Sequence, residues 1–168
     1  PRVHPELVDI VPFYRSGAVV DPSRTDGGVA LIDGGTGFSP GARSRLPLLA
    51  TMSAADGQEY FGLAVFPNML LDVTGTCIIA TAMYPRSASH TTVVSEYLFD
   101  PETIAAPDFD PSEVVDFNEL VGAQDYVVCE MVQRGVRSSR FTNGVLTSKD
   151  ALITAVNDRY LAERDAPR

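Results

Sequence analysis

The stretch that decides the fold is residues 60–84, which read YFGLAVFPNMLLDVTGTCIIATAMY. It holds three runs rich in apolar and aromatic residues, at 60–66, 69–74 and 76–84. Pro67 and Asn68 separate the first two runs and predict a kink or bulge there. Pro85 is expected to end the third run, and after a turn over 85–89 a fourth run at 90–99 is rich in strand formers. Adjacent strands with short connections predict an antiparallel meander.

The sequence that follows this sheet is helical in pattern. Asp110-Pro111-Ser112 predicts a helix start, because proline fits the first turn and Glu113 favours the positive N-terminal end. A periodic apolar stripe follows, made of Phe117, Leu120, Val121, Val128, Met131 and Val132. Gly135 is expected to end or interrupt this helix. A second helix, capped by Thr147 or Ser148, is predicted to carry Leu152, Val156, Tyr160 and Leu161.

The sequence before the sheet, residues 1–58, is punctuated by proline and paired glycines, which favours turns over helix. One short strand is predicted there, at 28–32. The order of irregular segment, antiparallel strands and helices predicts an α+β fold. We expect a curved antiparallel sheet with the long C-terminal helix laid across it, and a cavity between the two.

Composition bounds the class of protein. A chain of 168 residues with 45% hydrophobic and 21% charged residues is typical of one globular domain. The net charge of −9 argues against a nucleic-acid or anionic-membrane partner. No apolar run approaches the roughly 20 residues of a membrane helix. With only Cys77 and Cys129, both expected as buried core thiols, a reducing cytoplasm fits best.

Asp125 is the most informative single residue. On a helical wheel it lies about 40° from Val121 and about 20° from Val132, at about 100° per residue. Its carboxylate is therefore expected at the edge of the apolar face, where desolvation is costly without a counter-charge. Helix geometry leaves two answers open: a metal ion, or a structural ion pair with Arg134, Arg137 or a sheet residue.

Other polar residues carry weaker signals. His4, near the start of the chain, indicates little on its own, and His90 is expected to be exposed. The glycine-rich stretch 33–37 lacks the lysine and the following helix that a phosphate loop needs, so a surface loop is predicted. An acidic run is expected to be a solvated loop and helix start, and comprises Asp100, Asp108, Asp110, Glu113 and Asp116.

Two segments together resemble a known family. They are PRVHPEL at 1–7 and QDYVVCEMVQRG at 124–135, continuing to Ser138, Phe141 and Gly144. The second is similar to the C-terminal signature of the α subunit of Rieske-type non-haem iron ring-hydroxylating oxygenases, most closely the branch acting on glycine betaine, choline and carnitine. FPNMLL at 66–71 resembles the family's pocket strand, and 109–111 its lead into the long helix. The resemblance implies a helix-grip fold of the START and Bet v1 type.

The resemblance also implies a mononuclear Fe(II) site of two histidines and one carboxylate. His4 matches the second histidine and Asp125 the carboxylate, the metal-binding and catalytic residue; the first histidine would lie two positions before Pro1. Such a triad leaves coordination positions open for dioxygen and substrate. Residues expected to wall the substrate pocket are Phe66, Leu70, Val73 and Ile78.

The chain begins with Pro1 instead of Met, and we expect residues 1–168 to be the C-terminal portion of a single catalytic domain, incomplete at its N-terminus. The Cys-x-His and Cys-x-x-His pairs that hold a 2Fe–2S Rieske cluster are absent from this sequence and would lie in an upstream domain. The implied activity is hydroxylation or oxidative N-demethylation of a small organic substrate with dioxygen. Electrons would come from NAD(P)H through a reductase or ferredoxin, in a homotrimer, and the chain alone is not expected to turn over.

Two other functions stay open at this point. One is a non-catalytic helix-grip domain that binds an apolar or lipid-like ligand. The other is a divergent or truncated gene product that no longer binds iron. Asp125 together with an upstream histidine separates them from the oxygenase, because a binding module has no reason to keep both.

Overall fold

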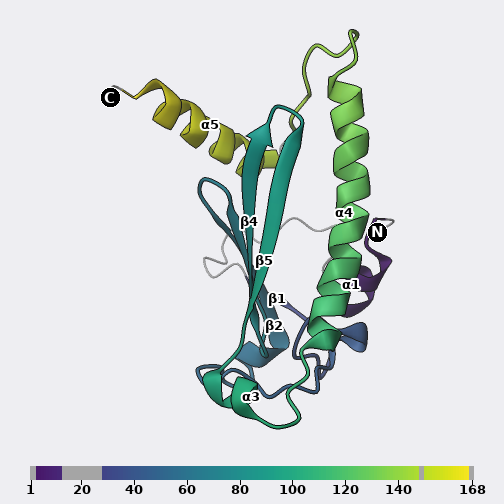
Figure 1. Cartoon of the computed structure of the whole chain (residues 1–168), viewed down its shortest axis with the longest axis vertical. Coiled ribbons are helices and arrows are strands. Elements are labelled where there is room, and N and C mark those ends of the chain that lie inside the picture. Colours follow the sequence, from purple (N-terminus) through teal and green to yellow (C-terminus); the bar gives the residue numbers. More distant parts are fainter. Residues whose placement is uncertain (1–2, 13–27, 148–149, 167–168) are drawn as a thin grey trace.

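The computed structural model describes residues 3–12, 28–147 and 150–166. Its centre is one five-stranded antiparallel sheet in the order β1-β2-β3-β4-β5 (Figure 1). The strands are β1 (Gly28–Ala30), β2 (Glu59–Val65), β3 (Met69–Val73), β4 (Ile78–Ser87) and β5 (His90–Leu98). The predicted meander is therefore confirmed, and the strands fall where the apolar runs were found.

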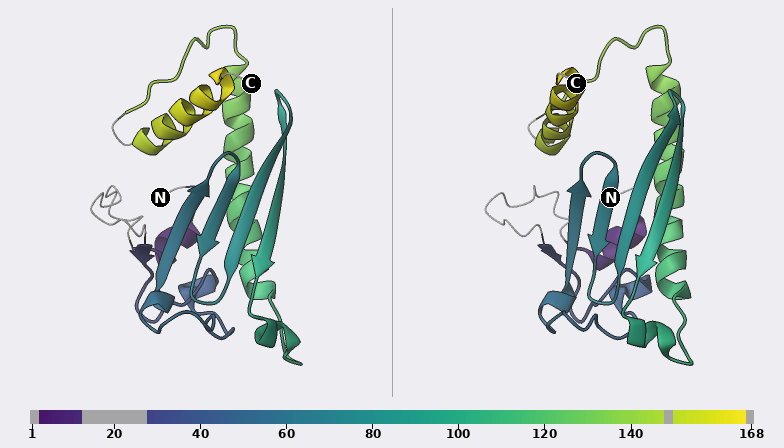
Figure 2. Two further views of the ribbon diagram at one scale, coloured as in Figure 1. Left: turned by 90° about the vertical axis from the view of Figure 1, so that its left-hand side faces the viewer. Right: turned by 60° about the vertical axis from the view of Figure 1, so that its left-hand side comes forward.

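The helices are α1 (Pro5–Ile10), α3 (Pro101–Ala105), α4 (Ser112–Val136) and α5 (Ala151–Asp165), with short 3-10 turns η1 (Pro40–Ala42) and η2 (Asp56–Gln58). The long helix α4 runs beside the sheet, and the two views of Figure 2 show it behind the strands over most of their length. The α+β fold with a long helix across an antiparallel sheet is confirmed, and it is consistent with a helix-grip catalytic domain.

The strand register decides which side chains face α4. Gly62 pairs with Asp72, Asp72 with Ile79, and Ile79 with Tyr97, so these four share one face. Ile79 belongs to the same buried cluster as Phe117 of α4. This row therefore lies on the inner, helix-facing side of the sheet, and the residues one position along each strand lie on the outer side.

The core occupies only one end of the molecule. Its buried members come from α1, the segment after β1, the start of β4 and the first turns of α4; they are Ile10, Val11, Leu31, Phe38, Ala42, Cys77, Ile79, Val114 and Phe117. The ring of Phe38 packs between sheet and helix: its centroid lies 4.7 Å from that of Tyr60 and 6.3 Å from that of Phe117. Segment 31–49 thus fills the space between sheet and helix at this end.

The other end is open. We call residues 112–124 of α4 the closed half and 125–136 the open half. Val114 and Phe117 of the closed half are buried, and Val121 packs on the core. In the open half every residue except Gln133 is exposed, including Met131 and Val132, which are each 58% accessible. The far ends of the strands also expose apolar side chains: Leu70 and Val93 on the inner face, and Leu63, Val65, Tyr84 and Val94 on the outer face.

Several local predictions were wrong. Pro85 does not end its strand: β4 continues to Ser87, because past Ala82 it pairs only with β5, and a proline without an N–H is tolerated there beside a register irregularity. The helix α1 lies in a region predicted to be irregular. Cys77 is buried as expected, but Cys129 is exposed because it lies in the open half.

The start of the last helix also differs from the prediction. Ser148 lies outside the described residues, and α5 begins at Ala151. Thr147 donates hydrogen bonds from its backbone N–H and its hydroxyl to Asp150 Oδ2, at 2.7 and 2.8 Å. The aspartate is therefore the acceptor that holds this turn, and the threonine precedes it. Arg159 of α5 lies 5.8 Å from the ring centroid of Phe66, at the tip of the β2–β3 hairpin.

Candidate metal centre

His4 and Asp125 meet, although they belong to opposite ends of the chain. His4 immediately precedes α1, and Asp125 is the first residue of the open half of α4. The distance from His4 Nε2 to Asp125 Oδ1 is 2.9 Å. The structure thus brings together the two residues that sequence reasoning selected as metal ligands.

The other ring nitrogen of His4 is held by an amide. His4 Nδ1 lies 2.9 Å from Gln124 Oε1, and Gln124 Nε2 donates to Glu6 Oε2 at 2.9 Å. Neither Gln124 nor Glu6 had been given a role from the sequence. The sequence did place an amide, Gln124, directly before the candidate ligand Asp125. Its role depends, however, on a contact with His4, which lies 120 positions away and cannot be inferred from sequence alone.

These residues fit a cation. Two donor atoms that each lie about 2.0–2.2 Å from one metal ion, at about 90° to each other, are about 3 Å apart. The 2.9 Å between His4 Nε2 and Asp125 Oδ1 matches this spacing, which is also the length of a direct hydrogen bond between the two groups. Glu6 adds a second carboxylate nearby, and its pKa is lowered chiefly by the hydrogen bond from Gln124. The two possible metal ligands are the imidazole of His4 and the carboxylate of Asp125, and the neighbouring carboxylate of Glu6 adds negative charge.

One expectation about Asp125 was wrong. Its side chain is 55% exposed, against 24% for His4, so it does not lie at the edge of a desolvated face. The physical reason is that, among the described residues, α4 beyond Gln124 is exposed at every position but Gln133. Its ion-pair partner is His4, whereas the sequence left Arg134, Arg137 or a sheet residue as structural alternatives. Within the described residues, no three His, Cys, Asp or Glu side chains cluster in a way that could hold a metal ion.

The four predicted pocket residues do not share a surface. Leu70 is on the inner face, two residues from Asp72. Val73 and Ile78 pair with each other on the outer face, and Phe66 lies beyond the end of β2. Side chains alternate along a strand, so Leu70 and Val73, three positions apart, lie on opposite faces of the sheet.

The inner face carries a polar pair that the sequence did not reveal. Tyr60 donates from its hydroxyl to Asp72 Oδ1 at 2.7 Å. Burial raises the pKa of Asp72, and the hydrogen bond from Tyr60 opposes that shift. This carboxyl lies where the closed core gives way to the exposed ends of the strands.

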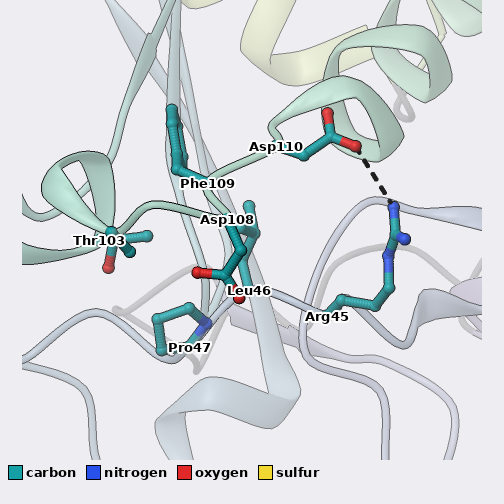
Figure 3. A pocket seen from close by; sticks show the side chains of 8 residues that line it. Arg45, Leu46, Pro47, Thr103, Asp108, Phe109 and Asp110 are labelled. Atoms are coloured by element: carbon teal, nitrogen blue, oxygen red, sulfur yellow. Dashed lines mark ion pairs between the residues drawn. The ribbon is translucent and has the colours of Figure 1, made fainter.

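A pocket of about 370 Å³ lies near α3, and its lining includes Arg45, Phe109 and Asp110 (Figure 3). The guanidinium of Arg45 is already paired, with Glu113 Oε2 at 3.0 Å and Asp110 Oδ2 at 3.8 Å. A second pocket, of about 280 Å³, is formed by Ala64 and α5. Neither is lined by residues of α4, so neither is the cavity expected between sheet and helix.

The acidic run between Asp100 and Asp116 was predicted to be solvated, and this is wrong for Glu113. Its side chain is 14% exposed and accepts hydrogen bonds from the Ser44 hydroxyl and the Arg45 backbone N–H, at 2.5 and 2.7 Å. Burial would raise the pKa of Glu113, but these hydrogen bonds outweigh it and the pKa is lowered. The carboxylate fastens segment 31–49 to the first turn of α4. His90 is exposed, as predicted.

No helix among the described residues is both long and apolar enough to cross a bilayer. A search of curated proteins found no match. Residues 1–163 match the family described as ring hydroxylating alpha subunit (catalytic domain). That match spans the sheet, α4, all but the last two residues of α5, and the His4–Asp125 pair. The chain belongs to the ring-hydroxylating alpha-subunit catalytic-domain family, whose members are oxygenases.

Proposed function

We propose that this chain is the C-terminal portion of the catalytic domain of a Rieske-type iron oxygenase, and that His4 and Asp125 are two of its three iron ligands. The observation that carries the proposal is the 2.9 Å approach of His4 Nε2 to Asp125 Oδ1, in a family member and at the positions the motif marks. The third ligand is a histidine two positions before Pro1, and the Rieske cluster lies in a domain further upstream.

The roles of the chain's own residues follow from their chemistry. His4 presents Nε2, and Asp125 presents one carboxylate oxygen, toward a common point. Bound Fe(II) supplies dioxygen activation at the coordination positions that a two-histidine, one-carboxylate triad leaves open. Leu70 and Val93 of the inner sheet face and the exposed apolar side chains of the open half, which begins at Asp125, offer a surface for the substrate.

The substrate and partners are the finer part of the proposal. The string at 124–135 favours methylated ammonium compounds over aromatic hydrocarbons, with hydroxylation or N-demethylation as the reaction. NAD(P)H would deliver electrons through a reductase or ferredoxin, and the intact protein would be a cytoplasmic homotrimer.

A second function is favoured by one observation. The apolar residues exposed on the sheet and on the open half would also suit a domain that only binds an apolar ligand. Such a domain has no need of a histidine and an aspartate that meet in space. We therefore rank metal-dependent oxygenation first.

The test uses the intact protein. Asp125→Ala should lose the mononuclear iron while keeping the cluster iron and the circular dichroism spectrum. Asp116→Ala, an exposed acid on the same helix, should retain iron and activity. Substrate-dependent oxygen consumption would be screened with methylated amines first and aromatic compounds second. Full iron and activity in Asp125→Ala would show that this carboxylate is not a ligand.

A further inference from the structure

Gln124 makes two hydrogen bonds with one side chain, and both reach the N-terminal segment. Its Oε1 faces His4 Nδ1 across 120 positions of sequence, and its Nε2 donates to Glu6 across 118. The residue is half-buried and stands directly before Asp125 on the same helix. The amide therefore links the two proposed ligands.

The orientation of the amide is fixed by Glu6. A carboxylate has only acceptor oxygens, so the NH₂ group of Gln124 must face Glu6 and its oxygen must face His4. An oxygen at this place accepts a proton from Nδ1 of the imidazole. When a metal is bound, the ring can then offer its lone pair from Nε2, whereas without a metal the 2.9 Å contact between Nε2 and Asp125 Oδ1 requires a proton on Nε2.

We propose that Gln124 is a positioning residue for the metal centre: with Glu6 behind it, it holds His4 in the Nδ1–H tautomer and fixes the ring so that Nε2 and Asp125 Oδ1 converge. This inference rests on the proposed function. Outer partners of ligating histidines set ring orientation and ligand basicity, and their loss typically weakens metal affinity about 10–100-fold.

The experiment measures Co(II) affinity of the intact, iron-depleted protein by competition with a chelator, together with the Co(II) absorption spectrum. Gln124→Leu should weaken affinity about 10–100-fold and alter the spectrum. The matched control is Asn118→Leu. Asn118 is also a half-buried amide of α4, and its Nδ2 donates to the Tyr97 hydroxyl at 2.9 Å, so its removal should lower stability without changing affinity.

A double variant that exchanges the amide of Gln124 and the carboxylate of Glu6 should keep the same hydrogen bonds. Gln124→Glu combined with Glu6→Gln preserves an acceptor for Nδ1–H and a donor–acceptor contact between the two side chains. It should bind Co(II) within about threefold of wild type, far closer than the 10–100-fold loss expected for Gln124→Leu. A double variant as weak as Gln124→Leu would overturn the inference, and so would equal losses in Gln124→Leu and Asn118→Leu.

The two proposals fail differently. If Asp125→Ala loses Co(II) and Gln124→Leu binds as tightly as wild type, the positioning role is wrong and the metal centre stands. If Asp125→Ala binds as tightly as wild type, the metal centre itself is wrong, and the role of Gln124 falls with it.

Discussion

The two halves of α4 are built from the same kinds of residue, yet only one half is packed. Val114 and Phe117 of the closed half are buried, whereas Val128, Met131 and Val132 of the open half are exposed. The difference lies in what stands opposite them. Segment 31–49 and the end of α1 fill the space beside the closed half, and no described residue does so beside the open half. An apolar stripe therefore specifies a helix, while its burial depends on a partner.

The largest effect expected from this contrast is on stability. Phe117→Ala should lower the free energy of unfolding by about 3–5 kcal/mol, because it leaves a cavity in the core. Met131→Ala, on the same helix but 58% exposed, should change it by no more than about 0.5 kcal/mol. Denaturant unfolding of both variants measures this. Equal losses would mean that the open half is packed in solution.

A smaller effect on stability concerns Glu113, whose carboxylate fastens segment 31–49 to the closed half of α4. Glu113→Gln should destabilise the protein by about 1–3 kcal/mol at pH 7, because the carboxylate charge is lost and an NH₂ group in place of Oε2 cannot accept from Arg45 Nε. The folded-state pKa of Glu113 is lowered, so its stabilisation is present above its ordinary value of about 4.3 and is lost as the pH falls through the folded value.

The matched control for Glu113→Gln is Glu130→Gln, because Glu130 is an exposed acid of the open half. It should leave both the stability and its pH dependence unchanged. Unfolding curves between pH 3 and pH 7 compare the variants, and the gap between wild type and Glu113→Gln should close in acid. A gap that persists at low pH would mean that the carboxylate charge is not what matters.

The smallest effect is expected at the boundary between the packed core and the open strand ends. Burial raises the pKa of Asp72, so its contribution to stability is present below the unfolded value of about 3.9 and is lost as the pH rises through the folded value. Asp72→Asn should therefore stabilise the protein at pH 7, by less than about 1 kcal/mol, and should be neutral in acid. Thermal melts at pH 3 and pH 7 measure this; a loss of stability at pH 7 would contradict it.

The sheet and the long helix could be predicted because they follow from local periodicity. The apolar runs between residues 60 and 99 and the stripe that begins at Phe117 are visible in sequence alone. The helix α1 could not be predicted in this way: six residues are too few to form a stable helix alone, and its last residue, Ile10, is held by the core.

The candidate site was predictable only in part. His4 and Asp125 were selected by resemblance, and their approach is a feature of the fold. The exposure of Asp125 and the bridging role of Gln124 depend on contacts between segments about 120 positions apart, which periodicity does not encode.

The bridge between His4 and Gln124 also has a consequence for chain entropy. The two residues lie 120 positions apart, and closing a loop of that size costs roughly 4–5 kcal/mol of chain entropy in the description used for disulfides. Hydrogen bonds alone are too weak to act as such a fastener. A cation bound to both His4 and Asp125 would stabilise the folded state by mass action, and it would join the N-terminal segment to α4 reversibly.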